Sequence, residues 1–238
     1  MSSSLRARAA SLGRGALDLL FPPRCGGCNS LGHWLCPQCR EALAWLEPPL
    51  CTQCGIPLRD GSLCRACANH PLPYLHIRSA VFFEGAARQA VHRLKYVGRA
   101  ALAAALAQVM LEAWEREHVL VQAVVPVPLH PERLRERGYN QAEVLARQLA
   151  RLTSLPLVEA GLRRTRNTPP QVGLSMLERQ RNVEGAFWCQ ERQFEGQTVL
   201  LVDDVCTTGS TLRAAAQALH QGGAVEIWAL TLARSRPG

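Results

Sequence analysis

Short apolar runs alternate with stretches of helical periodicity over residues 71–238 of the chain. Runs of this kind are typical of strands buried on both faces, and the helical stretches between them supply the cover. The pattern predicts an α/β domain with a central, mostly parallel sheet and flanking helices. The expected strands are Ile77–Phe83, Val121–Val127, Leu157–Arg166, Phe187–Trp188, Val199–Val202 and Val225–Ala233. The expected helices are Gly85–Tyr96, Ala100–Glu117, Asn140–Leu152 and one that begins near Thr211 and buries Leu212, Ala215, Ala216 and Leu219.

The stretch from Thr198 to Leu212 has the composition of a phosphate-binding site. Its apolar strand is followed by Asp203 and Asp204, and then by a small, hydroxyl-rich turn. A turn that opens a helix exposes unpaired backbone N–H groups, and the helix dipole favours an anion there. Ionised carboxylates only accept hydrogen bonds, so sugar hydroxyls or hydrated Mg²⁺ are their natural partners. The candidate phosphate ligands of the turn are Thr207, Thr208, Gly209, Ser210 and Thr211.

Two common phosphate loops are absent from the sequence. No G-x-x-x-x-G-K-[ST] occurs, and no G-x-G-x-x-G follows a strand. The order of strand, two acids, two small residues, T-G-x-T and helix instead resembles the binding motif for PRPP (5-phosphoribosyl 1-pyrophosphate) of type I phosphoribosyltransferases. A strand, turn and helix in which the acids merely cap the helix is the alternative. A cap needs one acid, whereas this stretch has two acids and four hydroxyls.

Eight of the ten cysteines form four C-x-x-C pairs between residues 25 and 67. Each pair presents two thiolates to one ion, and a tetrahedral Zn²⁺ ion needs four ligands. We therefore expect a double zinc ribbon with two closed, structural zinc sites, although crossed pairing and iron–sulfur ligation are alternatives. So small a module has too little core to fold alone, and bound metal would stabilise it. The expected ligands are Cys25, Cys28, Cys36 and Cys39 at one site, and Cys51, Cys54, Cys64 and Cys67 at the other.

We expect three parts along the chain. Residues 1–20 form an amphipathic helix or a disordered lead, residues 21–70 the zinc ribbon, and residues 71–238 the phosphoribosyltransferase-like domain. Arg14 and Asp18 interrupt the apolar region of the lead, which argues against a signal peptide. No apolar stretch approaches the roughly 18 residues that a membrane-spanning helix requires. Together with the metal-type cysteine spacing, these features predict a cytoplasmic protein that is not integral to a membrane.

Positive charge is concentrated in the second half of the chain. The net charge is +8, and residues 128–182 hold 10 basic and 5 acidic residues. A focused basic segment indicates an anionic partner. Lys95, the only lysine, lies near the end of an expected helix, where it either compensates the helix dipole or faces a ligand.

The basic segment comprises a loop after the strand at 121–127 and a long polar excursion at 163–182. By their resemblance to type I phosphoribosyltransferases, the loop would contact pyrophosphate and the excursion would be a flap that closes over the site. A solvated basic turn and a disordered loop are the alternatives. The candidate arginines are Arg133, Arg137, Arg163, Arg166 and Arg179.

The whole chain resembles the ComF family, bacterial proteins that join an N-terminal zinc ribbon to a phosphoribosyltransferase-like domain. The matching pieces are the four C-x-x-C pairs and the stretches 92–98, 124–143, 163–187 and 199–212. The resemblance implies cytoplasmic handling of incoming single-stranded DNA during natural transformation, with protein partners in the DNA-uptake machinery. It also implies that Asp203 and Asp204 bind the ribose hydroxyls or Mg²⁺, and that residues 207–211 hold the 5-phosphate.

Three functions fit these features. The first is a DNA-handling competence protein with a PRPP site, supported by the ribbon, the basic segment and the family resemblance. The second is a metabolic phosphoribosyltransferase with an unidentified acceptor, supported by the phosphate loop and both acids. The third is a non-catalytic PRPP sensor on the same fold. The sequence identifies neither a catalytic base nor an acceptor.

Overall fold

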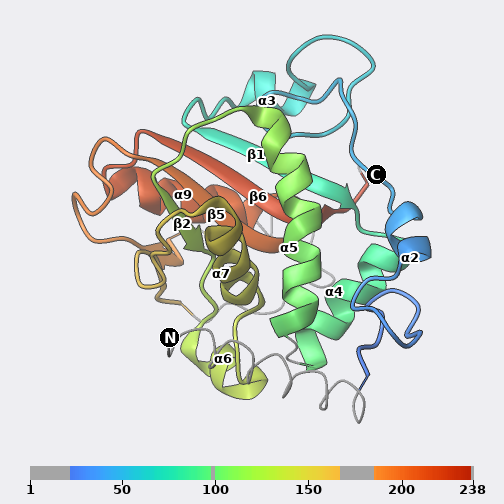
Figure 1. The fold of residues 1–238 in the computed structure, drawn as a ribbon. Helices are drawn as coiled ribbons and strands as arrows, with labels where there is room; N and C mark the ends of the chain where they lie inside the picture. Colours follow the sequence, from blue (N-terminus) through green and yellow to red (C-terminus); the bar gives the residue numbers. More distant parts are fainter. Residues whose placement is uncertain (1–21, 98–99, 167–184, 237–238) are drawn as a thin grey trace, which may run out of the picture.

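The core of the protein is a parallel sheet of four strands in the order β1-β6-β5-β2 (Figure 1). The computed structural model describes residues 22–97, 100–166 and 185–236. The strands are β1 (Leu75–Phe82), β2 (Ala123–Pro126), β5 (Thr198–Cys206) and β6 (Glu226–Arg234). Most residues of these strands are buried, as strands covered on both faces require. The predicted parallel sheet is confirmed.

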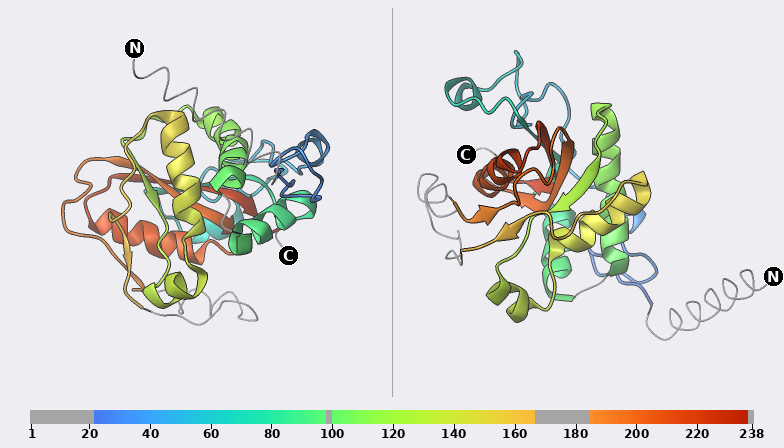
Figure 2. Two further views of the ribbon diagram at one scale, coloured as in Figure 1. Left: turned by 60° about the horizontal axis from the view of Figure 1, so that its bottom comes forward. Right: turned by 90° about the vertical axis from the view of Figure 1, so that its left-hand side faces the viewer.

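Helices cover both faces of the sheet. One face packs against α4 (Gly85–Val97), α5 (Ala100–Trp114) and α7 (Gln141–Thr153), and α5 runs into the short 3₁₀-helix η1 (Glu115–Glu117). The other face packs against α9 (Ser210–Gln221). The side view in Figure 2 shows α9 on one side of the sheet and α5 and α7 on the other. The chain therefore forms the three-layer α/β fold that its pattern predicts.

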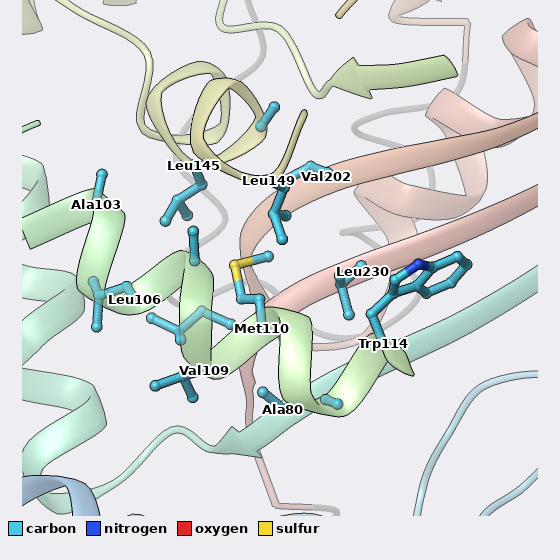
Figure 3. Close-up of a cluster of buried hydrophobic side chains, with 14 of the residues drawn as sticks. Ala80, Ala103, Leu106, Val109, Met110, Trp114, Leu145, Leu149, Val202 and Leu230 are labelled. Carbon is cyan, nitrogen blue, oxygen red and sulfur yellow. The ribbon is translucent and has the colours of Figure 1, made fainter. Parts of the chain in front are cut away.

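The largest hydrophobic cluster of the described residues lies under α5 and α7 (Figure 3). Met110 projects from α5 toward Leu145 and Leu149 of α7, and all three are fully buried. Trp114, at the end of α5, packs edge-on against Trp228 of β6, with ring centroids 5.8 Å apart. This packing fixes the helices over the sheet and so fixes the strand ends that carry the site.

Two elements differ from the sequence-based expectation. The segment expected as a basic loop contains a helix, α6 (Pro131–Arg137). The expected strand Leu157–Arg166 shrinks to β3 (Arg163–Arg164), which pairs antiparallel with β4 (Phe187–Trp188). Leu157 makes a single parallel bridge, to Val124. The sequence pattern was therefore right about the long elements and wrong about this loop and this strand.

The cysteine-rich segment, with its short helices α2 (Pro37–Glu41) and α3 (Arg65–Asn69), lies along the outer edge of β1. The N–H of Ile77 donates to the carbonyl of Gln53 at 2.7 Å, and the N–H of Phe82 donates to the carbonyl of Ala44 at 2.7 Å. These bonds satisfy backbone groups of β1 that an open edge strand would expose. The ribbon thus closes one edge of the sheet.

None of the helices in the described part of the chain is long and apolar enough to cross a membrane. The expected N-terminal helix or disordered lead at residues 1–20, and residues 167–182 of the expected flap, lie outside the described residues.

Candidate functional site

The two acids of the phosphate motif lie on β5 itself, which continues through them to Cys206. The backbone N–H of Asp204 donates to the carboxylate of Asp203 at 2.8 Å, so the two side chains share one small region at the carboxyl end of the sheet. This is the edge at which open α/β sheets bind ligands. Asp204 also lies 2.8 Å from the ammonium group of Lys95, which reaches it from α4.

The full ionisation of this pair of acids is unfavourable. Burial, reinforced by the neighbouring charge of Asp204, raises the pKa of Asp203 to about 8. The Lys95 ammonium acts in the opposite direction and lowers the pKa of Asp203. Two adjacent carboxylates that resist full ionisation gain from a cation or from hydroxyl donors. The arrangement is therefore suited to Mg²⁺ or to a sugar diol.

The phosphate loop connects β5 to α9 through Gly209, whose φ of 78° lies in the left-handed region. Glycine takes this conformation without steric cost. The hydroxyls of Thr208 and Ser210 lie 2.8 Å apart, and the N–H of Ser210 points at the Thr208 oxygen at 3.4 Å. Thr207 is exposed, and Thr211 lies in the first turn of α9. The predicted ligands therefore surround the N-terminus of a 12-residue helix, a geometry that favours an anion.

Arg164 brings positive charge near Asp203, and Arg133 lies near Arg164. Burial lowers the pKa of Arg164, the charge of Asp203 raises it, and Arg133 lowers it further. The guanidinium groups of Arg133 on α6 and Arg164 on β3 therefore interact electrostatically with each other, and Arg164 also interacts with Asp203. Arg133 was a predicted pyrophosphate ligand, whereas Arg164 was missed.

The remaining candidate arginines have different surroundings. Arg163 is exposed and lies over the ring of Trp188, with its guanidinium carbon 5.7 Å from the centroid. Arg137 donates to the side-chain oxygen of Gln141 at 2.6 Å, and Arg166 is exposed. Arg179 lies outside the described residues. Residues 163 and 164 occupy opposite faces of β3, which is why the neighbour of a predicted residue is the one that interacts with Asp203.

Lys95 is the site residue whose position sequence reasoning left open. Tyr139, just after α6, donates its hydroxyl to the carbonyl of Leu94 and so ties the end of α4 to this region. The structure favours the ligand-facing interpretation of Lys95 over dipole compensation, because its ammonium points at Asp204. Its being the only lysine in an arginine-rich chain was the available signal.

The cysteines form two separate groups of four in the order predicted, and within each group the sulfur atoms lie within 4.8 Å of one another. The Sγ atoms of Cys28 and Cys36, and those of Cys54 and Cys64, are 3.7 Å apart. A tetrahedral zinc ion with Zn–S bonds of ~2.3 Å requires sulfur separations of about 3.8 Å. The two groups therefore fit two structural zinc ions, and their membership is the one that the sequential pairing predicts.

Backbone N–H groups lower the pKa of some of these cysteines, whereas burial raises the pKa of Cys39, Cys54 and Cys67. Burial raises the pKa of Cys51, but backbone N–H groups that point at its sulfur prevail and lower it to about 6. The N–H of Cys36 likewise points at Cys25 at 3.3 Å. We call the first four cysteines cluster 1 (Cys25, Cys28, Cys36 and Cys39) and the others cluster 2 (Cys51, Cys54, Cys64 and Cys67).

The chain matches two family models. Residues 16–68 match the double zinc ribbon domain, and residues 134–237 match the phosphoribosyl transferase domain. One solved structure, the glutamine phosphoribosylpyrophosphate (PRPP) amidotransferase from B. subtilis complexed with ADP and GMP, is 20% identical with a TM-score of 0.40. That similarity covers 58% of this chain and 30% of the other.

Curated relatives match over most of their length. The DNA utilization protein YhgH of Escherichia coli (strain K12) is 34% identical over 224 residues, which are 89% of this chain and 98% of the relative. The competence protein ComFC of Bacillus subtilis (strain 168) is 30% identical over 212 residues, 84% of each chain. With its double zinc ribbon and phosphoribosyltransferase domain, the chain belongs to the ComF family.

Proposed function

We propose that the chain binds PRPP–Mg²⁺ at the carboxyl end of its sheet and handles incoming single-stranded DNA in the cytoplasm during natural transformation. The observation that carries the PRPP part is the convergence of the Asp203–Asp204 pair, Lys95 and the loop at the start of α9. The names of the relatives, a DNA utilization protein and a competence protein, support the DNA part.

Different residues of the site would bind different parts of PRPP. Backbone N–H groups and the hydroxyls of Thr207, Thr208 and Ser210 would hold the 5-phosphate. Once ligand binding displaces the proton of Asp203, Asp203 and Asp204 would accept hydrogen bonds from the ribose hydroxyls or hold hydrated Mg²⁺, and the negative charge of the ionised pair would favour an electron-poor sugar carbon. Arg133, Arg164 and Lys95 would contact pyrophosphate, with Arg179 and Arg166 as further candidates. Bound Mg²⁺ would neutralise charge on the leaving pyrophosphate.

Catalysis on this site would rest on positioning and charge rather than on a covalent intermediate. A phosphoribosyl transfer breaks the bond between the sugar carbon and pyrophosphate, and the charge that develops on each side is of the kind these groups stabilise. We assign no catalytic base and no acceptor. The same groups would also serve a non-catalytic PRPP sensor or a metabolic transferase.

One assay separates these three functions. It measures pyrophosphate release from PRPP–Mg²⁺ with and without single-stranded DNA, with the double variant Asp203→Ala/Asp204→Ala as the blank. Release that requires both the acids and DNA supports a transferase acting in DNA handling. Release without DNA supports a metabolic transferase, and PRPP binding without release supports a sensor. Absence of PRPP binding by calorimetry would refute the assigned site.

A second assay tests the DNA part. Arginine contacts to phosphates release counterions, so the affinity for a single-stranded oligonucleotide should fall as salt rises. The expected plot of log affinity against log salt concentration is linear, with a slope of about −0.7 for each phosphate contact. Binding that does not respond to salt would exclude an electrostatic DNA site.

A further inference from the structure

Two arginines connect cluster 2 with the strand and loop that carry the phosphate ligands. Arg213, in the first turn of α9, donates to the Sγ of Cys67 at 3.9 Å. Arg234, the last residue of β6 and 95% buried, donates to the carbonyl of Cys54 at 2.6 Å. Arg234 lies opposite Cys206 in the sheet, and Cys206 directly precedes the phosphate loop.

Ile77 of β1 fills the space between cluster 2 and the phosphate loop. A Cβ atom at Gly55, next to Cys54, would approach the carbonyl oxygen of Ile77 to 2.3 Å. On the other side, a Cβ atom at Gly209 would lie 3.4 Å from the Ile77 Cδ1. The ribbon thus lies against the backbone carbonyl of Ile77 and the loop against its side chain, so both parts pack on the same residue of β1.

The negative charge of a zinc-loaded cluster 2 explains why arginines lie between it and the phosphate loop. A zinc ion with four thiolates carries a formal charge of about −2, which would repel a phosphate held nearby. Arg213 and Arg234 offset that charge, because Arg213 donates to the Cys67 sulfur and Arg234 donates to the Cys54 carbonyl. Groups that hydrogen-bond metal ligands orient those ligands and tune the metal site.

Cluster 1 is connected with the other end of the site through α4. Arg93 donates to the carbonyls of Cys25, Gly26 and Gly27 at 2.8, 2.6 and 3.0 Å. Lys95, two residues further along the helix, points away from Arg93, because such neighbours face different sides of a helix. It reaches Asp204. Helix α4 therefore lies between cluster 1 and the acids.

We propose that Arg213 and Arg93 are positioning residues that couple the two cysteine clusters to different ends of the PRPP site. Through Arg213, cluster 2 fixes the position of the phosphate loop and so determines the affinity for the 5-phosphate. Through Arg93, cluster 1 fixes the position of Lys95 and so determines the affinity for pyrophosphate. The assignment of ligands to the two ends rests on the proposed function, whereas the coupling rests on the contacts alone.

The test uses the full, zinc-loaded chain and two fragments of PRPP. Calorimetry measures the dissociation constants of ribose 5-phosphate and of Mg²⁺–pyrophosphate for wild type, Arg213→Met and Arg93→Met. Arg213→Met should weaken ribose 5-phosphate about tenfold and change pyrophosphate less than about twofold, and Arg93→Met should do the reverse. The matched controls are Arg65→Met on α3 and Arg88→Met on α4, since both arginines are exposed. Equal losses for both ligands, or control variants that match the test variants, would overturn the coupling.

A second measurement keeps the coupling testable without ligand. Hydrogen–deuterium exchange should speed up at residues 203–213 in Arg213→Met and at residues 90–97 in Arg93→Met, with zinc content unchanged at two per chain. If wild type binds neither fragment, the proposed PRPP site fails, and the exchange data alone decide the coupling. Unchanged exchange at both segments would refute it.

Discussion

At the scale of single residues, Asp203 is held in a form that suits ligand binding more than stability. Its pKa is raised to about 8, mainly by burial, so the folded protein holds a proton there that the unfolded chain has lost. Stability contributed by that proton is complete below the ordinary pKa of 3.8 and is lost progressively as the pH rises from there to about 8. Asp203→Asn should therefore raise the melting temperature of the ligand-free protein at pH 9 by a few degrees and change it little at pH 5.

Thermal unfolding at the two pH values checks this prediction. The exposed Asp60 supplies the control, since Asp60→Asn removes a carboxylate that is not buried. An equal gain for Asp203→Asn at both pH values would mean that its carboxyl is not the titrating group. The same variant should bind PRPP–Mg²⁺ at least about tenfold more weakly, because an amide neither holds Mg²⁺ as well nor accepts as strongly from a diol.

The residues that sequence could and could not reveal differ in one respect. Asp203, Asp204 and the hydroxyls of the loop are contiguous, so their shared chemistry is visible in a short stretch. Lys95 and Arg164 come from other elements, and their approach to the acids depends on how α4 and β3 pack. Long-range packing of this kind leaves no local pattern, so these side chains could be listed as basic but not placed.

At the scale of elements, the two-residue strand β3 offers a matched pair of arginines. Arg164 interacts electrostatically with Asp203, whereas Arg163 lies on the opposite face over Trp188. Arg164→Met should weaken Mg²⁺–pyrophosphate binding about tenfold or more, the scale expected for a charged hydrogen bond. Arg163→Met should leave it within about twofold. Calorimetry on both variants checks this alternation of faces. Similar losses of affinity in the two variants would mean that both faces of β3, rather than one, contribute to the site.

Helix α6 was an element that the sequence did contain signals for. Pro131 is its first residue, His130 accepts from the N–H of Glu132 at 3.4 Å, and Gly138 ends it with a φ of 81°. Proline at the start and glycine just past the end are ordinary helix boundaries. The basic composition of the segment favours a loop, but these boundary residues favour a helix, and the structure contains the helix. The sequence of the expected strand Leu157–Arg166 contains no comparable boundary residues that would argue against a strand.

At the scale of the whole molecule, the zinc ribbon completes the sheet. The sequence predicted the two cysteine clusters, because C-x-x-C spacing is local, but gave no sign that the ribbon lies along β1. The N–H groups of Ile77 and Phe82 donate to ribbon carbonyls rather than to another strand. Ribbon, sheet edge and phosphate loop are therefore one folding unit, and metal bound in the ribbon should stabilise all of it.

Removing zinc from the intact chain tests that unity. A strong chelator should unfold the ribbon, lower the melting temperature by about 10 °C or more, and speed exchange of the Ile77 and Phe82 amides. Amides of β5 supply the internal control, since that strand is paired on both sides by β2 and β6. Cys51→Ser should lose about one zinc of two and expose Ile77, which pairs with the segment of cluster 2, before Phe82. If both amides stay protected after the metal is gone, the edge of β1 is held by the sheet itself, and the ribbon is an appendage rather than part of the fold.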